Sequence, residues 1–143
     1  IEKVLSVTGE IHEAVQQLVQ QLGIHKPKPS WDDLKLLVYS GNSILLIARY
    51  PDENSPIVGM LTISFYRVPT GGRSIVEDLV VDVSYRKLGI AKSLMLSAIE
   101  TAREADATGI ALTSNFQRVD ANQFYPAIGF EKRETNSYFY KLK

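Results

Sequence analysis

A short basic loop lies between a strand-like segment and a helix-like segment, and this combination is typical of an anion-binding site. A run rich in β-branched residues extends from Ile75 to Val83, the loop Arg86 to Gly89 follows, and an amphipathic helix is expected to begin near Ile90. Backbone N–H groups in the first turn of a helix lack intrahelical partners and carry a partial positive charge. The small residues Gly89 and Ala91 let a ligand approach this backbone closely. The sequence therefore predicts a phosphate-binding loop.

The overall composition limits what kind of protein this is. With 143 residues and no cysteine, we expect one domain spanning residues 1–143, without disulfides or a thiol nucleophile. Sixteen basic and sixteen acidic residues give zero formal net charge, which argues against binding to nucleic acid or to an anionic membrane. His12 and His25 have no ligand-like spacing, so no metal site is expected. No apolar stretch approaches the roughly 18 residues of a membrane span. We expect a cytoplasmic protein.

Hydrophobic spacing and capping residues predict the elements that position the loop. A short strand is expected at residues 2–7, followed by a helix that Thr8 caps and Gly23 ends. A second helix begins after Ser30 and ends near Gly41. The remaining elements are expected in this order: strands at Ser43–Tyr50, Ile57–Arg67 and Ile75–Val83, a helix from Ile90, a strand at Gly109–Thr113, a helix at Arg118–Ile128, and closing strands at Phe130–Thr135 and Ser137–Leu142.

The directions of these strands follow from their connections. The run Ser43 to Tyr50 is nearly all apolar, which indicates a strand buried on both faces. Turn-forming clusters at residues 51–56 and 69–72 join this strand and the next two into an antiparallel meander. The helix after the loop carries a crossover, so the short strand at Gly109–Thr113 must run parallel to the central strand.

Two motifs give the chain a resemblance to a known family. The loop reads Arg86-x-x-Gly89-x-Ala91, which fits neither a Walker loop nor a dinucleotide fingerprint. It is similar to the acetyl-CoA pyrophosphate loop of the GCN5-related N-acetyltransferases, the GNAT superfamily. The segment Ala121 to Phe130, with Phe124-Tyr125 and Gly129-Phe130, resembles the helix that lies beside the thioether end of the cofactor in that family. The chain is therefore identified as a member of this superfamily by resemblance.

Two further likenesses point to the small-molecule branch of the superfamily. Leu112 to Asn115, followed by Arg118 and Phe124-Tyr125, resembles aminoalkylphosphonate N-acetyltransferases. Val76 to Asp82 is similar to the central strand of glucosamine-6-phosphate N-acetyltransferases. Substrate-contacting loops vary on any scaffold, so neither likeness identifies the substrate.

The resemblance implies an α/β (α+β) domain with the order β-α-α-β-β-β-α-β-α-β-β. In this fold a mixed, mostly antiparallel sheet is flanked by helices and splayed between strands 4 and 5, where the pantetheine arm of acetyl-CoA inserts. The resemblance assigns the arm and acetyl carbonyl to backbone groups of Leu79, Val80 and Val81. It assigns the pyrophosphate to the loop and helix start, residues Arg86, Lys87, Leu88, Gly89, Ile90, Ala91 and Lys92.

The same resemblance implies direct transfer of acetyl to an amine, which must first lose a proton. A carboxylate near the middle of the central strand can accept it. Glu77 and Asp78 point to opposite faces unless a bulge intervenes, so at most one enters the site. We favour Glu77 acting through water; the alternative is a solvent-side carboxylate or an ion-pair partner. By resemblance, the Tyr125 hydroxyl protonates the departing CoA thiolate; the alternative is that Tyr125 only packs.

Two residues depart from the family pattern. Arg118 stands seven positions before Tyr125, where many relatives have asparagine that contacts the cofactor. Asn115 and Asn122 are the candidates to replace that amide. Pro126 stands inside the short helix, where it removes one backbone donor and is expected to kink the helix beside Tyr125.

Taken with the resemblance, the residues predict an acetyl-CoA-dependent N-acetyltransferase that acts on a primary amine of a small molecule by direct attack in a ternary complex. Two alternatives remain open at this point. One is acetylation of a protein N-terminus or lysine, and the other is a non-catalytic CoA-binding regulatory module. A homodimer is also left open.

Overall fold

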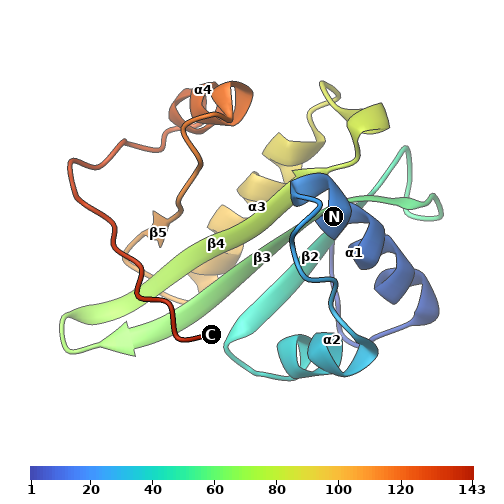
Figure 1. Cartoon of the computed structure of the whole chain (residues 1–143), viewed down its shortest axis with the longest axis horizontal. Helices are drawn as coiled ribbons and strands as arrows, with labels where there is room; N and C mark the ends of the chain where they lie inside the picture. Colours follow the sequence, from blue (N-terminus) through green and yellow to red (C-terminus); the bar gives the residue numbers. More distant parts are fainter. The chain divides into compact units, whose positions relative to one another are not determined.

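Residues 1–112 contain the sheet and residues 113–143 form a second compact unit. The computed structural model describes all 143 residues (Figure 1). The prediction that residues 1–143 make a single domain stays a prediction.

The first unit is built on a five-stranded sheet of mixed, mostly antiparallel strands. Its strands lie in the order of the sequence: β1 (Glu2–Lys3), β2 (Ser43–Arg49), β3 (Ile57–Val68), β4 (Gly71–Val81) and β5 (Ile110–Ala111). The first four strands pair antiparallel, and β5 pairs parallel to β4, as the crossover argument predicts. The β4–β5 ladder contains only the pairs Ser74 with Ile110 and Ile75 with Ala111, although β4 continues to Val81. This agrees with the splay that the resemblance implies.

Both N-terminal helices begin at the predicted caps. Helix α1 (Gly9–Leu22) starts after Thr8, whose hydroxyl accepts from the Ile11 N–H at 3.2 Å, and it ends at Gly23. Helix α2 (Trp31–Val38) starts with a reciprocal capping box between Ser30 and Asp33, with bonds of 2.9 and 3.0 Å. Such caps satisfy backbone donors that the helix cannot satisfy itself.

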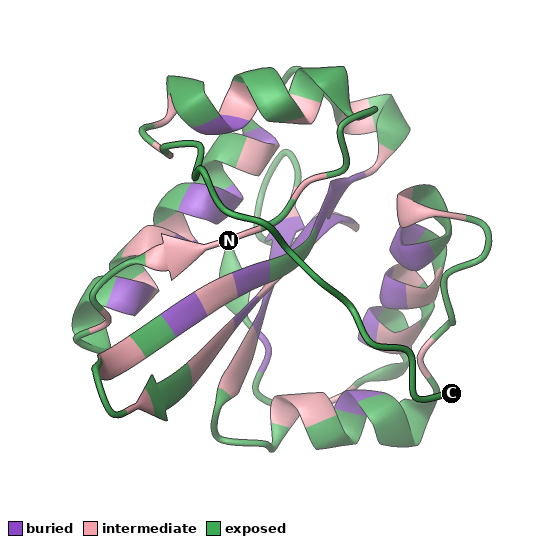
Figure 2. Ribbon diagram, turned by 60° about the vertical axis from the view of Figure 1, so that its left-hand side comes forward, coloured by how far each residue is buried: buried purple, intermediate pink, exposed green.

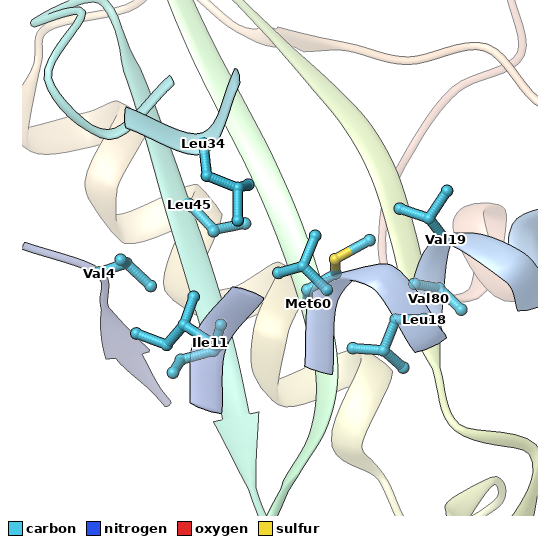
Figure 3. Packing of buried hydrophobic residues seen from close by; sticks show 10 residues of the cluster. Val4, Ile11, Leu18, Val19, Leu34, Leu45, Met60 and Val80 are labelled. Carbon is cyan, nitrogen blue, oxygen red and sulfur yellow. The ribbon is translucent and has the colours of Figure 1, made fainter. Parts of the chain in front are cut away.

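The two faces of the sheet are covered by different helices. On one face, buried side chains of α1 and α2 pack on β2, β3 and β4, as Leu18, Leu34, Leu45 and Met60 show in Figure 3. Helix α3 (Ile90–Glu104) covers the other face: a Cβ on Gly59, which is adjacent to Met60, would lie 3.2 Å from Leu94 Cδ1.

The prediction that β2 is buried on both faces is confirmed. Leu45 and Ile47 belong to the cluster under α1 and α2, while Leu46 and Ala48, which point the other way, are 3% and 1% exposed. A nearly continuous apolar run is what such a central strand requires.

Four of the predicted strands differ from the structure, because two are shorter than expected and two are absent. The strand expected at residues 2–7 contains only Glu2–Lys3, and the one expected at Gly109–Thr113 contains only Ile110–Ala111. The closing strands expected at Phe130–Thr135 and Ser137–Leu142 are wrong, because residues 130–143 have no regular secondary structure. Residues 131–143 are exposed throughout (Figure 2). A hairpin without a sheet edge to extend is marginally stable, and a two-residue β5 offers little edge.

Candidate functional site

The loop between β4 and α3 has a backbone conformation that favours glycine at one position. A short 3₁₀ turn, Val83–Tyr85, follows β4, and Gly89 at the start of α3 has φ +83° and ψ 8°. A side chain with a Cβ rarely adopts this left-handed conformation. Apart from Gly89 itself and its immediate neighbours along the chain, no atom lies within 4 Å of the place where a Cβ on Gly89 would be. Gly89 is therefore needed for its backbone angles, and the space in front of it is open.

Four consecutive backbone N–H groups, from Gly89 to Lys92, have no acceptor within the chain. The first helical bond of α3 runs from the Ser93 N–H to the Gly89 carbonyl at 3.0 Å, and no side chain caps the helix. Lys87 and Lys92 are exposed at either side of these donors. Oriented free donors at a helix start, with cations nearby, suit a phosphate or pyrophosphate group. The predicted loop residues therefore lie together in an arrangement that fits an anion.

Side chains on both sides of the loop hold it to β4. Asp82 Oδ1 accepts from the Ser84 N–H at 2.8 Å and so fixes the 3₁₀ turn. Arg86 Nε donates to the Val81 carbonyl at 3.2 Å. Arg86, predicted as a cofactor-binding residue, thus also folds the loop back onto the end of the strand.

Gln21, in the last turn of α1, contacts the start of the loop, and this contact was not predicted from the sequence. Its Nε2 donates to Asp82 Oδ2 at 3.2 Å, and its Oε1 accepts from the Val83 N–H at 2.9 Å. Gln20 and Gln21 are adjacent and alike in sequence, and the partners lie 61 and 62 positions away. No local signal distinguishes the two glutamines.

The central strand contains a bulge at the position of the two candidate carboxylates. Met60 pairs with Val80 but Thr62 pairs with Glu77, so Asp78 and Leu79 together lie opposite one residue of β3. Asp78 has φ +53°, an uncommon value outside glycine. Such a bulge leaves backbone groups out of the ladder. The bulge that the sequence analysis allowed is therefore present, and the side chains of β4 do not alternate strictly between the two faces of the sheet at this point.

The bulge places Glu77 on the face of the sheet that α1 and α2 cover. Cross-strand partners share a face, and Glu77 lies opposite Thr62, which follows Met60 at a spacing of two. Glu77 is exposed and has neither a hydrogen bond nor an ion pair within the chain. Glu77 is therefore not a member of an ion pair. The other alternative, a carboxylate that only faces solvent, is compatible with its exposure.

Leu79, Val80 and Val81 lie at the end of β4 with buried side chains, 5–8% exposed. They can therefore contact a ligand only through their backbone. One edge of β4 pairs with β3 here, but the β5 ladder ends at Ile75. Backbone groups at the other edge of residues 79–81 have no strand partner, and this fits the extended pantetheine arm that the resemblance assigns to them.

The second unit contains the other predicted residues on and around α4 (Val119–Ala127). Tyr125 lies in the last turn of α4 and is 8% exposed, and its ring contacts those of Phe124 and Phe130 at centroid distances of 5.4 and 5.9 Å. Burial raises the pKa of the Tyr125 hydroxyl, and the positive charge of Arg118 opposes this shift. The hydroxyl therefore stays protonated at neutral pH. Pro126 lies after Tyr125 and does not end the helix before it.

The two candidate asparagines are partly engaged in local structure. Asn122 Nδ2 donates to the Asn115 carbonyl at 2.8 Å, and Asn115 Oδ1 accepts from the Gln117 N–H at 2.9 Å. This leaves Asn115 Nδ2 and Asn122 Oδ1 free. Arg118 is exposed at the start of α4, and its side chain has no hydrogen bond within the chain. The cofactor contact expected of these three residues stays a prediction.

The structure contains neither a group of side chains suited to a metal ion nor a helix suited to span a membrane. No group of three or more His, Cys, Asp or Glu side chains is arranged to hold a metal ion. No helix has the length and apolar character needed to cross a bilayer.

Three known proteins are similar to this chain in sequence or in structure. A glucosamine 6-phosphate N-acetyltransferase from Trypanosoma brucei brucei is 35% identical over 66 residues, and the match spans 45% of this chain and only 43% of that protein. An aminoglycoside acetyltransferase from an uncultured soil metagenomic sample has 20% identity and a TM-score of 0.86, covering 99% of this chain and 95% of the other. A transcriptional regulator from Bacillus halodurans C-125 has 24% identity and a TM-score of 0.80, covering 98% and 99%.

At these identities the two structural likenesses show the fold alone. The sequence profile of the Acetyltransferase (GNAT) family, however, matches residues 11–130, which is most of the chain. The match includes both the β4–α3 loop and Tyr125. The chain therefore belongs to the acetyltransferase (GNAT) family, which confirms its resemblance to the GCN5-related N-acetyltransferases.

Proposed function

We propose that the chain is an acetyl-CoA-dependent N-acetyltransferase that transfers acetyl to a primary amine of a small molecule by direct attack in a ternary complex. The observation that carries the proposal is the row of four free N–H groups from Gly89 to Lys92, at the end of a strand whose outer edge has no strand partner beyond Ile75. The row suits the pyrophosphate of CoA and the edge suits its extended arm. An amide donor at residues 79–81 would stabilise the charge that develops on the acetyl oxygen.

Two side chains supply the proton transfers in this proposal. Glu77 accepts, through water, the proton that the substrate ammonium must lose before its nitrogen can attack the thioester carbonyl. Tyr125 donates a proton to the sulfur as the C–S bond breaks, so that CoA leaves as the thiol, and the second proton that the attacking nitrogen loses on becoming an amide restores the Tyr125 hydroxyl. The exposure of Glu77 and the raised pKa of Tyr125, which burial causes, support these roles.

The sheet beside Glu77 carries hydroxyl groups, which favours a hydroxylated small amine as acceptor. Thr62 lies opposite Glu77, and Ser64 lies on the same face and forms a 2.7 Å hydrogen bond with Ser43. Hydroxyls both donate and accept, so they can bind a polyol. The relative from Trypanosoma brucei brucei is named for glucosamine 6-phosphate, an amine of this kind. A small amine is thereby favoured over a protein acceptor. The cytoplasmic location and the homodimer stay predictions.

The first test is the thermal stability of the protein with CoA and acetyl-CoA. A ligand that binds only the folded state at a hundredfold excess over its Kd stabilises that state by about 2.7 kcal/mol, which raises the melting temperature by several degrees. Gly89→Val should abolish most of the shift because a β-branched residue strains φ and obstructs the donors. Lys87→Ala, which removes one exposed charged side chain and leaves the backbone donors open, should reduce the shift less. An unchanged melting temperature at saturating cofactor would refute the cofactor assignment.

The second test separates the three candidate functions. Thiol release from acetyl-CoA is measured with amino sugars, simple alkylamines and peptides that carry a free N-terminus or lysine. Turnover with hydroxylated small amines supports the proposal, and turnover with peptides alone would replace it by a protein acetyltransferase. Cofactor binding without turnover on any amine would leave the regulatory module.

A further inference from the structure

Gln21 connects two elements that the sheet alone does not connect. It lies in the last turn of α1, and its side-chain amide uses both of its polar groups: Nε2 donates to Asp82 Oδ2 at 3.2 Å and Oε1 accepts from the Val83 N–H at 2.9 Å. The amide therefore spans the first two residues after β4. Helix α1 is held by its buried face on the sheet, so it provides a fixed reference for this point.

The chain leaves the sheet at this contact. The Asp82 N–H donates to the Val58 carbonyl at 2.7 Å, which is the last bond to β3, and Asp82 Oδ1 fixes the 3₁₀ turn through Ser84. From Val83 onward the loop is mostly exposed until Ile90, which is 7% exposed and packs at the start of α3. The direction in which the loop starts is therefore decided at Asp82 and Val83.

We propose that Gln21 is a positioning residue for the phosphate loop. By holding Asp82 and Val83 against α1, it keeps the free donors of Gly89 to Lys92 at a constant place relative to the outer edge of β4. The inference rests on the proposed function, in which one ligand uses both places at once. A loop that is already oriented pays less conformational entropy when the ligand binds.

The test compares Gln21→Ala with Gln20→Ala. Gln20 is the adjacent residue of the same type on the same helix, is exposed and has no side-chain hydrogen bond within the chain. We expect Gln21→Ala to raise the Kd for CoA roughly two- to tenfold, the range for one or two exposed hydrogen bonds, with a melting temperature like that of Gln20→Ala. Gln21→Glu should lose at least as much affinity, because it cannot donate to Asp82 and places a second carboxylate beside it.

Hydrogen exchange of the ligand-free protein provides a readout that does not depend on CoA. Exchange in residues 83–92 should be faster in Gln21→Ala than in Gln20→Ala, while exchange in β2 and β3 stays unchanged. In an Asp82→Ala background, Gln21→Ala should have a smaller effect on Kd, because one of the two contacts of Gln21 is already lost.

The possible failures are distinguishable. If the wild-type chain does not bind CoA, the proposed function fails, and the exchange measurement still decides whether Gln21 orders the loop. If the wild type binds CoA but Gln21→Ala matches Gln20→Ala in Kd and in loop exchange, the positioning role is refuted. A loss of affinity accompanied by a lower melting temperature and faster exchange throughout α1 and β3 would also refute it, since Gln21 would then only stabilise the fold.

Discussion

Replacing Tyr125 by phenylalanine removes one hydroxyl and keeps the ring. The Tyr125 ring is 8% exposed and packs edge-on against Phe124 and Phe130, contacts that phenylalanine also makes. The hydroxyl has no hydrogen bond within the chain, so its removal leaves no buried partner unsatisfied. We expect the free energy of unfolding to change by less than about 0.5 kcal/mol.

The expected effect on catalysis is much larger than the effect on stability. If the hydroxyl protonates the departing thiolate, its loss should lower kcat by roughly 10²–10⁴-fold. At 1.36 kcal/mol for each factor of ten, this corresponds to roughly 2.7–5.4 kcal/mol of transition-state stabilisation. The difference in magnitude means that unfolding cannot explain a loss of turnover. Affinity for CoA should stay within about twofold, since the resemblance assigns the hydroxyl to the sulfur rather than to binding.

The assay is steady-state thiol release at saturating amine and acetyl-CoA, with Tyr138→Phe as the matched control. Tyr138 lies in the same unit and is 88% exposed. Burial raises the pKa of Tyr125, so wild-type kcat should not fall through deprotonation of this group below pH about 10. An unchanged kcat in Tyr125→Phe across this pH range would refute the reasoning and reduce Tyr125 to a packing residue.

Two further predictions concern carboxylates. A bidentate hydrogen bond from Arg49, at 2.8 and 2.9 Å, lowers the pKa of Glu10 from its ordinary 4.5, so the stability from this pair is present above pH about 4.5 and is lost as pH falls through the lower folded value. Chemical denaturation should show Glu10→Gln less stable than the control Glu13→Gln at pH 7, with the gap in the free energy of unfolding closing as the pH falls below 4.5; a constant gap would contradict the linkage. Glu77→Gln should lower kcat by roughly 10²-fold and Asp78→Asn much less, measured by thiol release, and equal losses would remove Glu77 as the specific base.

Local chemistry explains why much of the first unit could be predicted. Thr8 and Ser30 cap helices through bonds that span three residues, so the signal lies within a short stretch of sequence. Gly89 carries the left-handed turn before α3, and glycine is the residue type that tolerates it. The apolar run of β2 likewise matches a strand covered on both faces.

The two closing strands that were expected after Gly129 could not be predicted correctly from local sequence. Phe130 to Leu142 contains aromatic residues at strand-like spacing, but a strand forms only if another strand of matching length is available. The structure contains β5 as Ile110–Ala111 alone, and residues 130–143 form no ladder. Strand formation is a property of the pair, and the sequence of one member does not determine it.

The sequence by itself determined the family, the order of the elements in the first unit and the place of the phosphate loop, because caps, turns and periodicity act over a few residues. Only the tertiary structure decided the bulge at Asp78, which puts Glu77 on the face of α1, and the contact of Gln21 with the loop. Both depend on which residues of distant segments lie opposite one another. That register is selected by the packing of the whole sheet, because shifting one strand by one residue moves every side chain of that strand to the opposite face.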